Sequence, residues 1–139
     1  MAESSTVEQL NALCKNTLID TLGIEFLSAI KGEVVAKMPV DSRTIQPFKL
    51  LHGGASLALA ESVASVGSSM LVDTSKSLVV GVEVNGNHLR GVKSGFVRAT
   101  ARIVHQGMRT HVWNVEIVDD SNRMVMVGRV TMMVVDNKA

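Results

Sequence analysis

The sequence is poor in the residues that mark several large classes of protein. Its 139 residues include one cysteine, Cys14, two prolines and no tyrosine, and aromatic residues make up only 3%. A single cysteine excludes an intrachain disulfide framework and a cysteine-rich zinc site. So few aromatic side chains, with a formal net charge of +1, offer neither a stacking surface nor a basic stripe for nucleic acid.

Long apolar runs are also missing. Ser, Gly, Glu or Arg interrupts each apolar stretch well short of the ~18 residues that a membrane span needs. The N-terminal residues lack the basic segment and apolar core of a secretory signal. We therefore expect no membrane and no nucleic-acid partner, and a reducing, cytoplasmic location. With 46% apolar residues, the chain suits one domain spanning residues 1–139.

The first third of the chain predicts a helix followed by two strands. Apolar residues at three-to-four spacing indicate an amphipathic helix over Val7–Leu22. Gly23 stands where such a helix ends. Two apolar runs with a Gly-containing turn between them predict strands at Ile24–Ile30 and Val34–Val40. A loop over residues 41–51 follows.

Residues after this loop predict a second helix and then four strands. Ala55–Val72 is rich in Ala and Leu, and we expect this central helix to be surrounded on most sides. The four strand-like segments are Leu78–Leu89, Phe96–His105, Arg109–Val118 and Met124–Val135. Hairpin-length connections between them indicate an antiparallel sheet. The whole order predicts an α+β fold in which an antiparallel sheet wraps around one helix.

Glu61 lies in the middle of the predicted central helix. No Lys or Arg occurs between Leu50 and Ser75, so no neighbour in sequence can pair with it. A carboxylate buried without a cation loses several kcal/mol, roughly, or takes up a proton. Such a group is a candidate for catalysis because its pKa is raised. The residues alone leave open the alternative that Glu61 faces solvent. Ser62, Ser65, Ser68 and Ser69 continue the same polar stripe.

The tripeptide His52-Gly53-Gly54 precedes this helix. Two glycines allow a ligand to approach the backbone closely. The first free amides of a helix favour negative charge, so this segment can form an oxyanion hole for acyl transfer. An ordinary helix-entry turn is the alternative.

Three further residues carry groups suited to such a site. Gln46 and His52 can donate to a carbonyl oxygen, and Ser65, one turn after Glu61, can hold a water or bond the backbone. Cys14 has no base nearby, so we do not expect a catalytic thiol. The remaining histidines lack the spacing of metal ligands, and we expect no metal and no cofactor.

With Gln46, Pro47, His52-Gly53-Gly54 and Glu61 at these spacings, the segment 41–61 strongly resembles the hotdog-fold acyl-CoA thioesterases. The resemblance is to the branch that contains 4-hydroxybenzoyl-CoA thioesterase with a catalytic Glu, and to the 1,4-dihydroxy-2-naphthoyl-CoA thioesterases. It covers nearly the whole chain, including Asn11, Leu22-Gly23-Ile24, Met38-Pro39-Val40-Asp41, Val80-Gly81, Asn87-His88, Gly107, Arg109 and Trp113.

The resemblance implies a hotdog fold and a homodimer in which two sheets join, paired again into a homotetramer. It places the active site at the dimer interface, where Gln46, His52 and Gly53 of one subunit face Glu61 and Ser65 of the other. The Gly53 N–H then polarises the thioester carbonyl with help from Gln46 and His52. Glu61 acts as nucleophile or as general base, and Ser65 positions the water.

The resemblance also implies that the substrate is an acyl-CoA, with an aryl or medium-sized acyl group. The positions that match family residues near CoA are His88, Arg90, Gly107, Arg109 and Thr110. Two residues depart from the family pattern. Leu89 replaces a common His, and Lys49 replaces a common Gly, which leaves the acyl group open.

Three other functions remain as alternatives. A thioesterase acting on acyl groups bound to a carrier protein is nearest to the main hypothesis. A hotdog dehydratase also uses a His and an acidic residue, but its spacing differs from the nine residues between His52 and Glu61. An acyl-CoA sensor needs an output module, for which the residues before the first strand offer only one helix.

Overall fold

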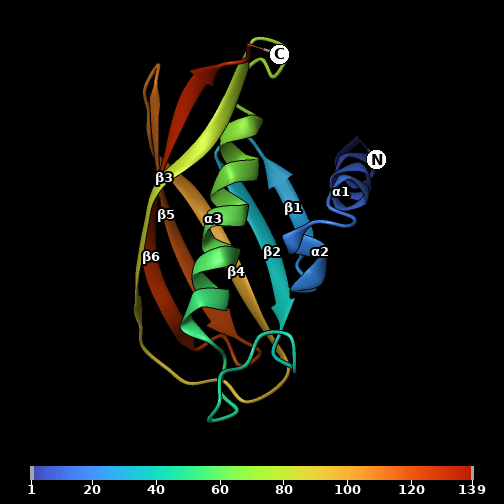
Figure 1. Cartoon of the computed structure of the whole chain (residues 1–139), viewed down its shortest axis with the longest axis vertical. Helices are drawn as coiled ribbons and strands as arrows, with labels where there is room; N and C mark the ends of the chain where they lie inside the picture. Colours follow the sequence, from blue (N-terminus) through green and yellow to red (C-terminus); the bar gives the residue numbers. More distant parts are fainter. Residues whose placement is uncertain (1, 139) are drawn as a thin grey trace.

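A computed structural model describes residues 2–138 of the chain (Figure 1). It contains three helices and six strands. In order these are α1 (Ala2–Leu13), α2 (Leu18–Thr21), β1 (Glu25–Ile30), β2 (Glu33–Pro39), α3 (Gly53–Ser69), β3 (Ser77–His88), β4 (Phe96–Gln106), β5 (Thr110–Asp119) and β6 (Met124–Asp136). No helix within residues 2–138 has both the length and the apolar character needed to cross a bilayer.

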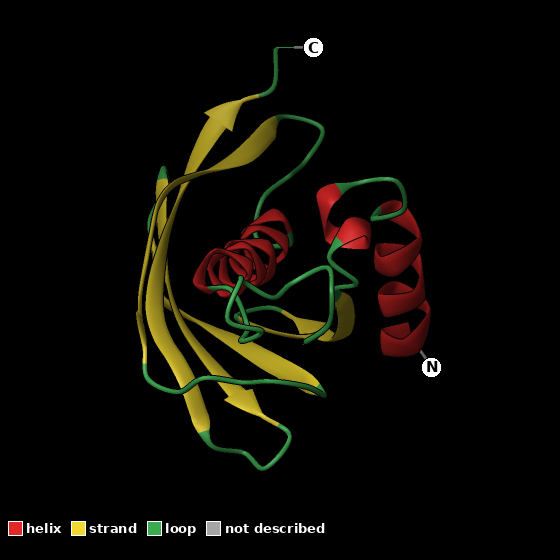
Figure 2. Ribbon diagram, turned by 60° about the horizontal axis from the view of Figure 1, so that its bottom comes forward, coloured by secondary structure: helices red, strands yellow, loops and turns green. Residues whose placement is uncertain are grey.

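All six strands form one sheet in the order β1-β2-β4-β5-β6-β3, and every neighbouring pair is antiparallel. The sheet is strongly curved, and α3 lies in its concave face (Figure 2). The predicted α+β architecture, an antiparallel sheet around one helix, is therefore confirmed. The six strands lie within one or two residues of their expected bounds. The central helix begins two residues earlier than expected, at Gly53, and ends at Ser69.

The sequence prediction of hairpins among the last four strands is wrong at one place. β3 does not pair with β4; it pairs with β6, and β4 lies between β2 and β5. The connection after His88 instead runs along the end of the sheet. There the Leu51 N–H donates to the Val92 carbonyl (2.8 Å) and the Val40 N–H donates to the Gly95 carbonyl (2.8 Å).

The N-terminal helix predicted over Val7–Leu22 is broken into α1 and α2. Asn16 adopts a left-handed φ of 63°, which Asn tolerates better than most residues, and the Thr17 hydroxyl donates to the Cys14 carbonyl (2.5 Å). The break leaves Leu13 and Leu18 at 80% and 65% exposure, although the periodicity placed Leu13 and Leu18 on the buried stripe. Burial raises the pKa of the Cys14 thiol.

The two edges of the sheet differ. At the β1 edge, the Asn11 side chain of α1 donates to the Phe26 carbonyl (3.0 Å) and accepts from the Phe26 N–H (2.8 Å). Asn11 thus bonds the backbone of β1 as a neighbouring strand would. At the other edge, β3 pairs only with β6 among the described strands, so its outer backbone groups are free to pair.

The core forms between α3 and the concave face of the sheet. Alternate residues of β4 and β5, including Val97, Ala99 and Trp113, are fully buried there, as their alternation predicts. Gly67 allows the close approach of α3, because a Cβ at this position would lie 2.5 Å from the Trp113 ring. The helix therefore packs at backbone distance against β5.

A hydrogen-bonded group of three side chains lies inside this core. The Trp113 Nε1–H donates to the Ser68 hydroxyl (2.8 Å), and His111 Nδ1 lies 2.8 Å from the same oxygen. Ser68 is fully buried, so it does not belong to the exposed polar stripe predicted with Glu61. Burial, followed by the charge of His105, lowers the pKa of His111 below its ordinary value of 6.5. The Ser68 O–H can donate to Nδ1 only while His111 is neutral.

We expect His111 to make stability depend on pH. A lowered pKa in the folded state means that the unfolded chain binds the proton more readily, so folding stability falls as pH drops below about 6.5. His111→Asn keeps a neutral partner for Ser68 and should flatten this dependence between pH 7 and pH 5.5. Urea unfolding of wild type and His111→Asn at several pH values measures it. An unchanged slope in His111→Asn would contradict the prediction.

Candidate active site

The start of α3 leaves one backbone amide available. His52 caps the helix: its Nδ1 accepts from the Gly54 N–H (2.8 Å), and its carbonyl accepts from the Ala55 and Ser56 amides (3.0 and 3.3 Å). The Gly53 N–H, the first of the helix, has no partner among the described residues. It lies at the positive end of the helix dipole, where it can stabilise charge that develops on a carbonyl oxygen. Since Nδ1 is an acceptor, neutral His52 carries its proton on Nε2, a second donor.

Gly53 lies directly against the His88 ring of β3. A Cβ at Gly53 would lie 2.9 Å from His88 Nε2, closer than real side chains approach. His88, expected from the resemblance to lie near CoA, is thus placed directly against the helix N-terminus.

The loop before α3 is held by its own hydrogen bonds. The Gln46 N–H donates to the Leu50 carbonyl (2.8 Å), and the Gln46 side-chain oxygen accepts from the Phe48 N–H. This leaves the Gln46 NH₂ group as a free donor. Lys49 has a left-handed φ of 65°, a conformation that favours glycine, which gives a physical meaning to the departure noted at this position.

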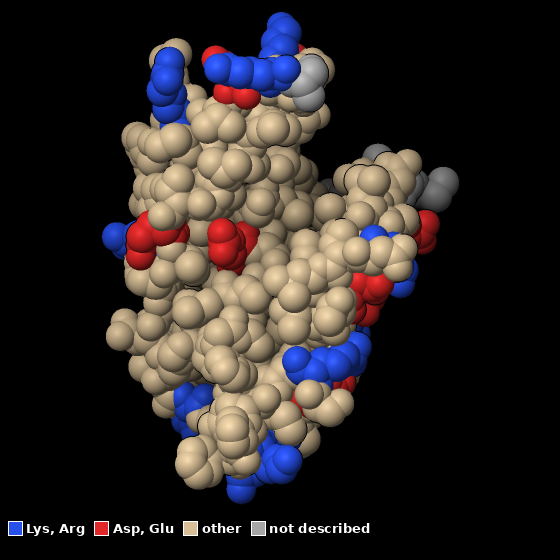
Figure 3. Space-filling view, in the orientation of Figure 1, with Lys and Arg blue, Asp and Glu red and all other residues tan. Residues whose placement is uncertain are grey.

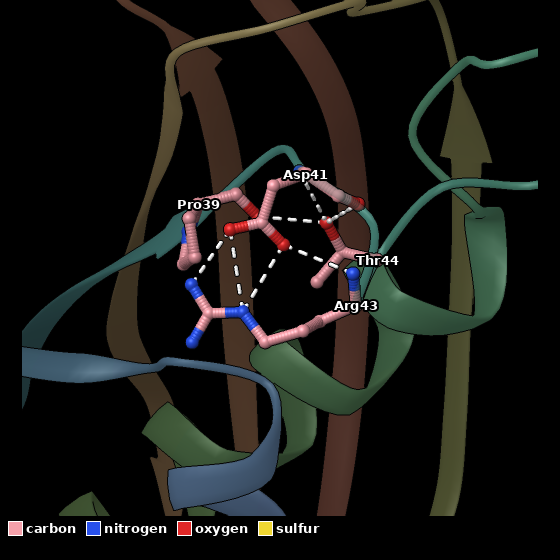
Figure 4. Close-up of polar contacts among 4 residues, drawn as sticks. All are labelled: Pro39, Asp41, Arg43 and Thr44. Atoms are coloured by element: carbon pink, nitrogen blue, oxygen red, sulfur yellow. Dashed lines mark hydrogen bonds and ion pairs between the residues drawn. The ribbon is translucent and has the colours of Figure 1, made fainter.

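A second set of contacts anchors the loop to β2 (Figure 4). The Asp41 carboxylate accepts from the Arg43 Nη2 (2.6 Å) and from the Arg43 backbone N–H (3.0 Å), and Arg43 lowers the pKa of Asp41. The buried Thr44 hydroxyl donates to the Pro39 carbonyl (2.7 Å), and the His52 N–H donates to the Thr44 carbonyl (2.8 Å). Asp41, Arg43 and Thr44 were not among the site residues predicted from the sequence, although Asp and Thr in a Pro-flanked loop are signals for such turns.

Several expected residues line one cavity of about 410 Å³ at this end of α3. Apolar side chains and polar groups share its wall, and the start of α3 forms part of it. The residues are Gln46, Leu50, Leu51, Gly53, Ser56, His88, Leu89, Arg90, Gly91 and Val125.

Glu61 and Ser65 lie further along α3, away from this cavity. Eight residues of helix separate Glu61 from Gly53, a rise of about 12 Å. Glu61 is exposed in the single chain, so of the two alternatives that the sequence left open, the one in which it faces solvent holds there. Glu61 lies on the face of α3 that is directed toward the edge strand β3. A Cβ built on Gly81 of that strand would clash with the Glu61 carboxylate. Ser65 is half-buried one turn later, and its carbonyl accepts from the Ser69 hydroxyl (3.0 Å).

The structure divides the expected CoA-binding residues into two groups. His88 and Arg90 lie at the N-terminal end of α3, whereas Gly107, Arg109 and Thr110 form the turn at the opposite end of the sheet (Figure 1). There the Gly107 N–H donates to the Thr110 carbonyl (2.8 Å). Arg109 lines a separate cavity of about 530 Å³ together with Ser77, Met108, Met133, Val134, Val135, Asp136 and Lys138.

Cations follow the same division. On the face shown in Figure 3, Lys and Arg atoms gather at both ends of the molecule; acidic atoms lie between the ends and also beside the cations at the upper end. Within residues 2–138, no group of three or more His, Cys, Asp and Glu side chains is arranged to hold a metal ion.

Comparison with known proteins identifies close relatives. A sequence model described as the thioesterase superfamily matches residues 48–126. The 1,4-dihydroxy-2-naphthoyl-CoA hydrolase of Escherichia coli is 43% identical over 126 residues, which are 91% of this chain and 92% of that protein. The protein of the same name from Listeria monocytogenes is 39% identical over 84% of this chain and 94% of its own length.

Solved structures agree with the sequence comparison. A mutant thioesterase from Pseudomonas aeruginosa has a TM-score of 0.92 and 51% identity, covering 94% of each chain. A thioesterase from Haemophilus influenzae has a TM-score of 0.90 and 41% identity, covering 96% of this chain and 92% of its own. The hotdog fold expected from the sequence is therefore confirmed.

We expect Gly53→Ala to destabilise the protein, because its Cβ would overlap His88. His88 is exposed, so its ring can move aside, and forcing it off its rotamer costs about 0.5–1.5 kcal/mol. Removing the ring with His88→Ala should recover most of that loss, so the two substitutions should be strongly non-additive in urea unfolding. Gly91→Ala is the control, since its Cβ would make an ordinary 3.4 Å contact with Leu50. Additive effects of Gly53→Ala and His88→Ala would show that the two residues do not touch.

Proposed function

The chain belongs to the thioesterase superfamily, and we propose that it hydrolyses aryl or medium-sized acyl-CoA thioesters to the free acid and CoA. The observation that carries this proposal is the free Gly53 amide at the start of α3, open to a cavity of about 410 Å³. A thioester hydrolase needs such a donor where the carbonyl oxygen becomes negative.

The donors at this end of α3 suit a thioester carbonyl. In the proposed complex the Gly53 N–H donates to the carbonyl oxygen. The Gln46 side chain, which lines the same cavity, and the His52 Nε2–H assist. A single oxyanion donor is worth about 10²–10³ in rate. The Asp41, Arg43 and Thr44 contacts hold the loop, so these donors need little rearrangement when substrate binds.

Glu61 supplies the attacking group by one of two routes. As a nucleophile, its oxygen attacks the carbonyl carbon and CoA leaves as thiolate; water then opens the resulting anhydride. As a general base, it takes a proton from a water held by Ser65, and that water attacks instead. Both routes consume one water and release acid and thiol. A thiolate is a good leaving group, so neither route needs a strong general acid.

A second copy of the chain completes the site in this proposal. Gly53 and Glu61 lie about 12 Å apart on one helix, too far for both to act on one carbonyl. The open edge of β3, with Leu78, Val80 and Val82 exposed at 43–51%, suits antiparallel pairing with the same strand of a partner. This pairing sets two α3 helices side by side in opposite directions, so Glu61 of one copy approaches Gly53 of the other. Two such dimers form the proposed tetramer.

The same pairing explains the two groups of CoA-binding candidates. Antiparallel β3 strands bring the start of one strand, near Arg109, toward the end of the other, near Arg90. The cations of two chains then converge on the phosphates of one CoA. The aryl preference is supported by the two relatives named 1,4-dihydroxy-2-naphthoyl-CoA hydrolase, at 43% and 39% identity.

Thiol release from a panel of thioesters tests the function. We expect wild type to hydrolyse benzoyl-CoA and 1,4-dihydroxy-2-naphthoyl-CoA faster than short-chain or long-chain acyl-CoA. Glu61→Ala should lose at least about 10³-fold in kcat, since it removes the attacking group. Size-exclusion chromatography and unfolding curves check that the variant still folds and assembles.

Two outcomes of the panel would contradict the proposal. Full activity of Glu61→Ala would make Glu61 structural. Faster turnover of the same acyl group on a carrier protein than on CoA would make the carrier-protein thioester the substrate.

Mixing two inactive variants tests whether the site is shared. Gln46→Ala and Glu61→Ala, refolded together, form mixed dimers in which one of the two sites keeps both residues. Random pairing then restores about a quarter of wild-type activity. A site built within one chain would give no recovery, because every chain in the mixture would lack one of the two groups.

A further inference from the structure

We propose that Gly81, on the edge strand β3, is a positioning residue for the carboxylate of Glu61. This inference rests on the proposed function, because it concerns how the attacking group is held. Gly81 itself touches no substrate in this proposal; it acts through Glu61.

The contact between the two residues leaves no space for a side chain at position 81. A Cβ built on Gly81 would lie 2.1 Å from Glu61 Oε1 and 3.0 Å from its carboxyl carbon. Real Cβ atoms do not come closer than about 3.0 Å to such atoms. Every residue other than glycine would therefore displace the carboxylate.

Gly81 lies on the face of the sheet that α3 covers. Its partner on β6 is Met132, whose side chain is fully buried in the core. The register between β3 and β6 shifts directly after Gly81, so that Val82 is an extra residue. Such bulges bend a strand and redirect the side chains beside it. The bulge and the missing side chain occur together at the point where Glu61 crosses β3.

Within residues 2–138 of the single chain, no ion pair holds the exposed Glu61 carboxylate. Among the described residues, no hydrogen bond or salt bridge reaches its carboxylate, and no Lys or Arg lies between Leu50 and Ser75. The carboxylate thus keeps its oxygens free for attack or for a water. A glycine inside a strand weakens that strand, and here it supplies the space that the attacking group needs.

A second glycine of the same strand provides a matched control. Gly86 pairs with Gly128 and faces the same side of the sheet as Gly81. A Cβ at Gly86 would lie 2.7 Å from the Sδ of the buried Met126, so Gly86→Ala disturbs core packing beside β3 but does not reach Glu61. Gly86→Ala therefore adds the same methyl group to β3 without touching the carboxylate.

Steady-state kinetics on a thioester that wild type hydrolyses, such as benzoyl-CoA, tests the proposal. We expect Gly81→Ala to lower kcat by about 10- to 100-fold, the usual cost of misplacing a reacting group by about 1 Å, with little change in KM. Gly86→Ala should stay within about twofold of wild type in both constants.

A double-substitution cycle separates positioning from a general effect on β3. Asp is one methylene shorter than Glu, so Glu61→Asp withdraws the carboxylate from position 81. In that background, Gly81→Ala should cause no further loss of kcat. An equal fold-loss in both backgrounds would overturn the proposal, as would a wild-type kcat in Gly81→Ala or a change of its assembly state in size-exclusion chromatography.

Unfolding by urea tests the same contact without activity. Because glycine weakens a strand, Gly81→Ala should raise the midpoint in the Glu61→Ala background and shift it to a lower value when Glu61 is present. If wild type hydrolyses no thioester but this non-additivity is observed, the proposed function fails while the contact stands. If thioesters are hydrolysed and both cycles are additive, the function stands and the positioning role of Gly81 fails.

Discussion

Close packing of α3 within the curved sheet is the constraint on which the rest of this structure depends. The helix lies in the concave face of the sheet, and at Gly67 it comes so close that a Cβ would lie 2.5 Å from the Trp113 ring. This packing determines the rotation and height of the whole helix. The positions of the Gly53 amide at its start and of the Glu61 carboxylate two turns later follow from it.

The two edges of the sheet differ in whether another strand can pair with them. The β1 edge is closed by the Asn11 side chain, which bonds the backbone of Phe26 in both directions. The β3 edge stays open, and the Glu61 side chain is directed toward this edge. In a single chain, Glu61 thus lies near the open β3 edge, and the Gly53 amide lies at the start of the same helix. In the proposed dimer, cations from opposite ends of the two chains lie on one ligand.

Much of this could be predicted from the sequence, because its signals are local. Alternation in β4 and β5 predicts which side chains face α3, and Trp113 and Val97 are buried as expected. The Gly53-Gly54 pair correctly indicates a helix start, where the Gly53 amide is free. The break between α1 and α2 was not visible, since the apolar spacing continues through Cys14 while the backbone turns at Asn16. The pairing of β3 with β6 was likewise not visible, because strand order depends on contacts distant in sequence.

The sequence by itself determined the element types, the central helix and the set of chemical groups, from Gln46 to Glu61. These depend on residue spacing within one element, which a linear pattern records. Only the tertiary structure decided that Glu61 is exposed above Gly81, that His88 lies against Gly53, and that Arg90 and Arg109 stand at opposite ends. Each of these depends on the distance between elements, and packing of α3 against the sheet sets that distance. A periodic pattern within one segment does not show which residue of another helix or strand packs beside it.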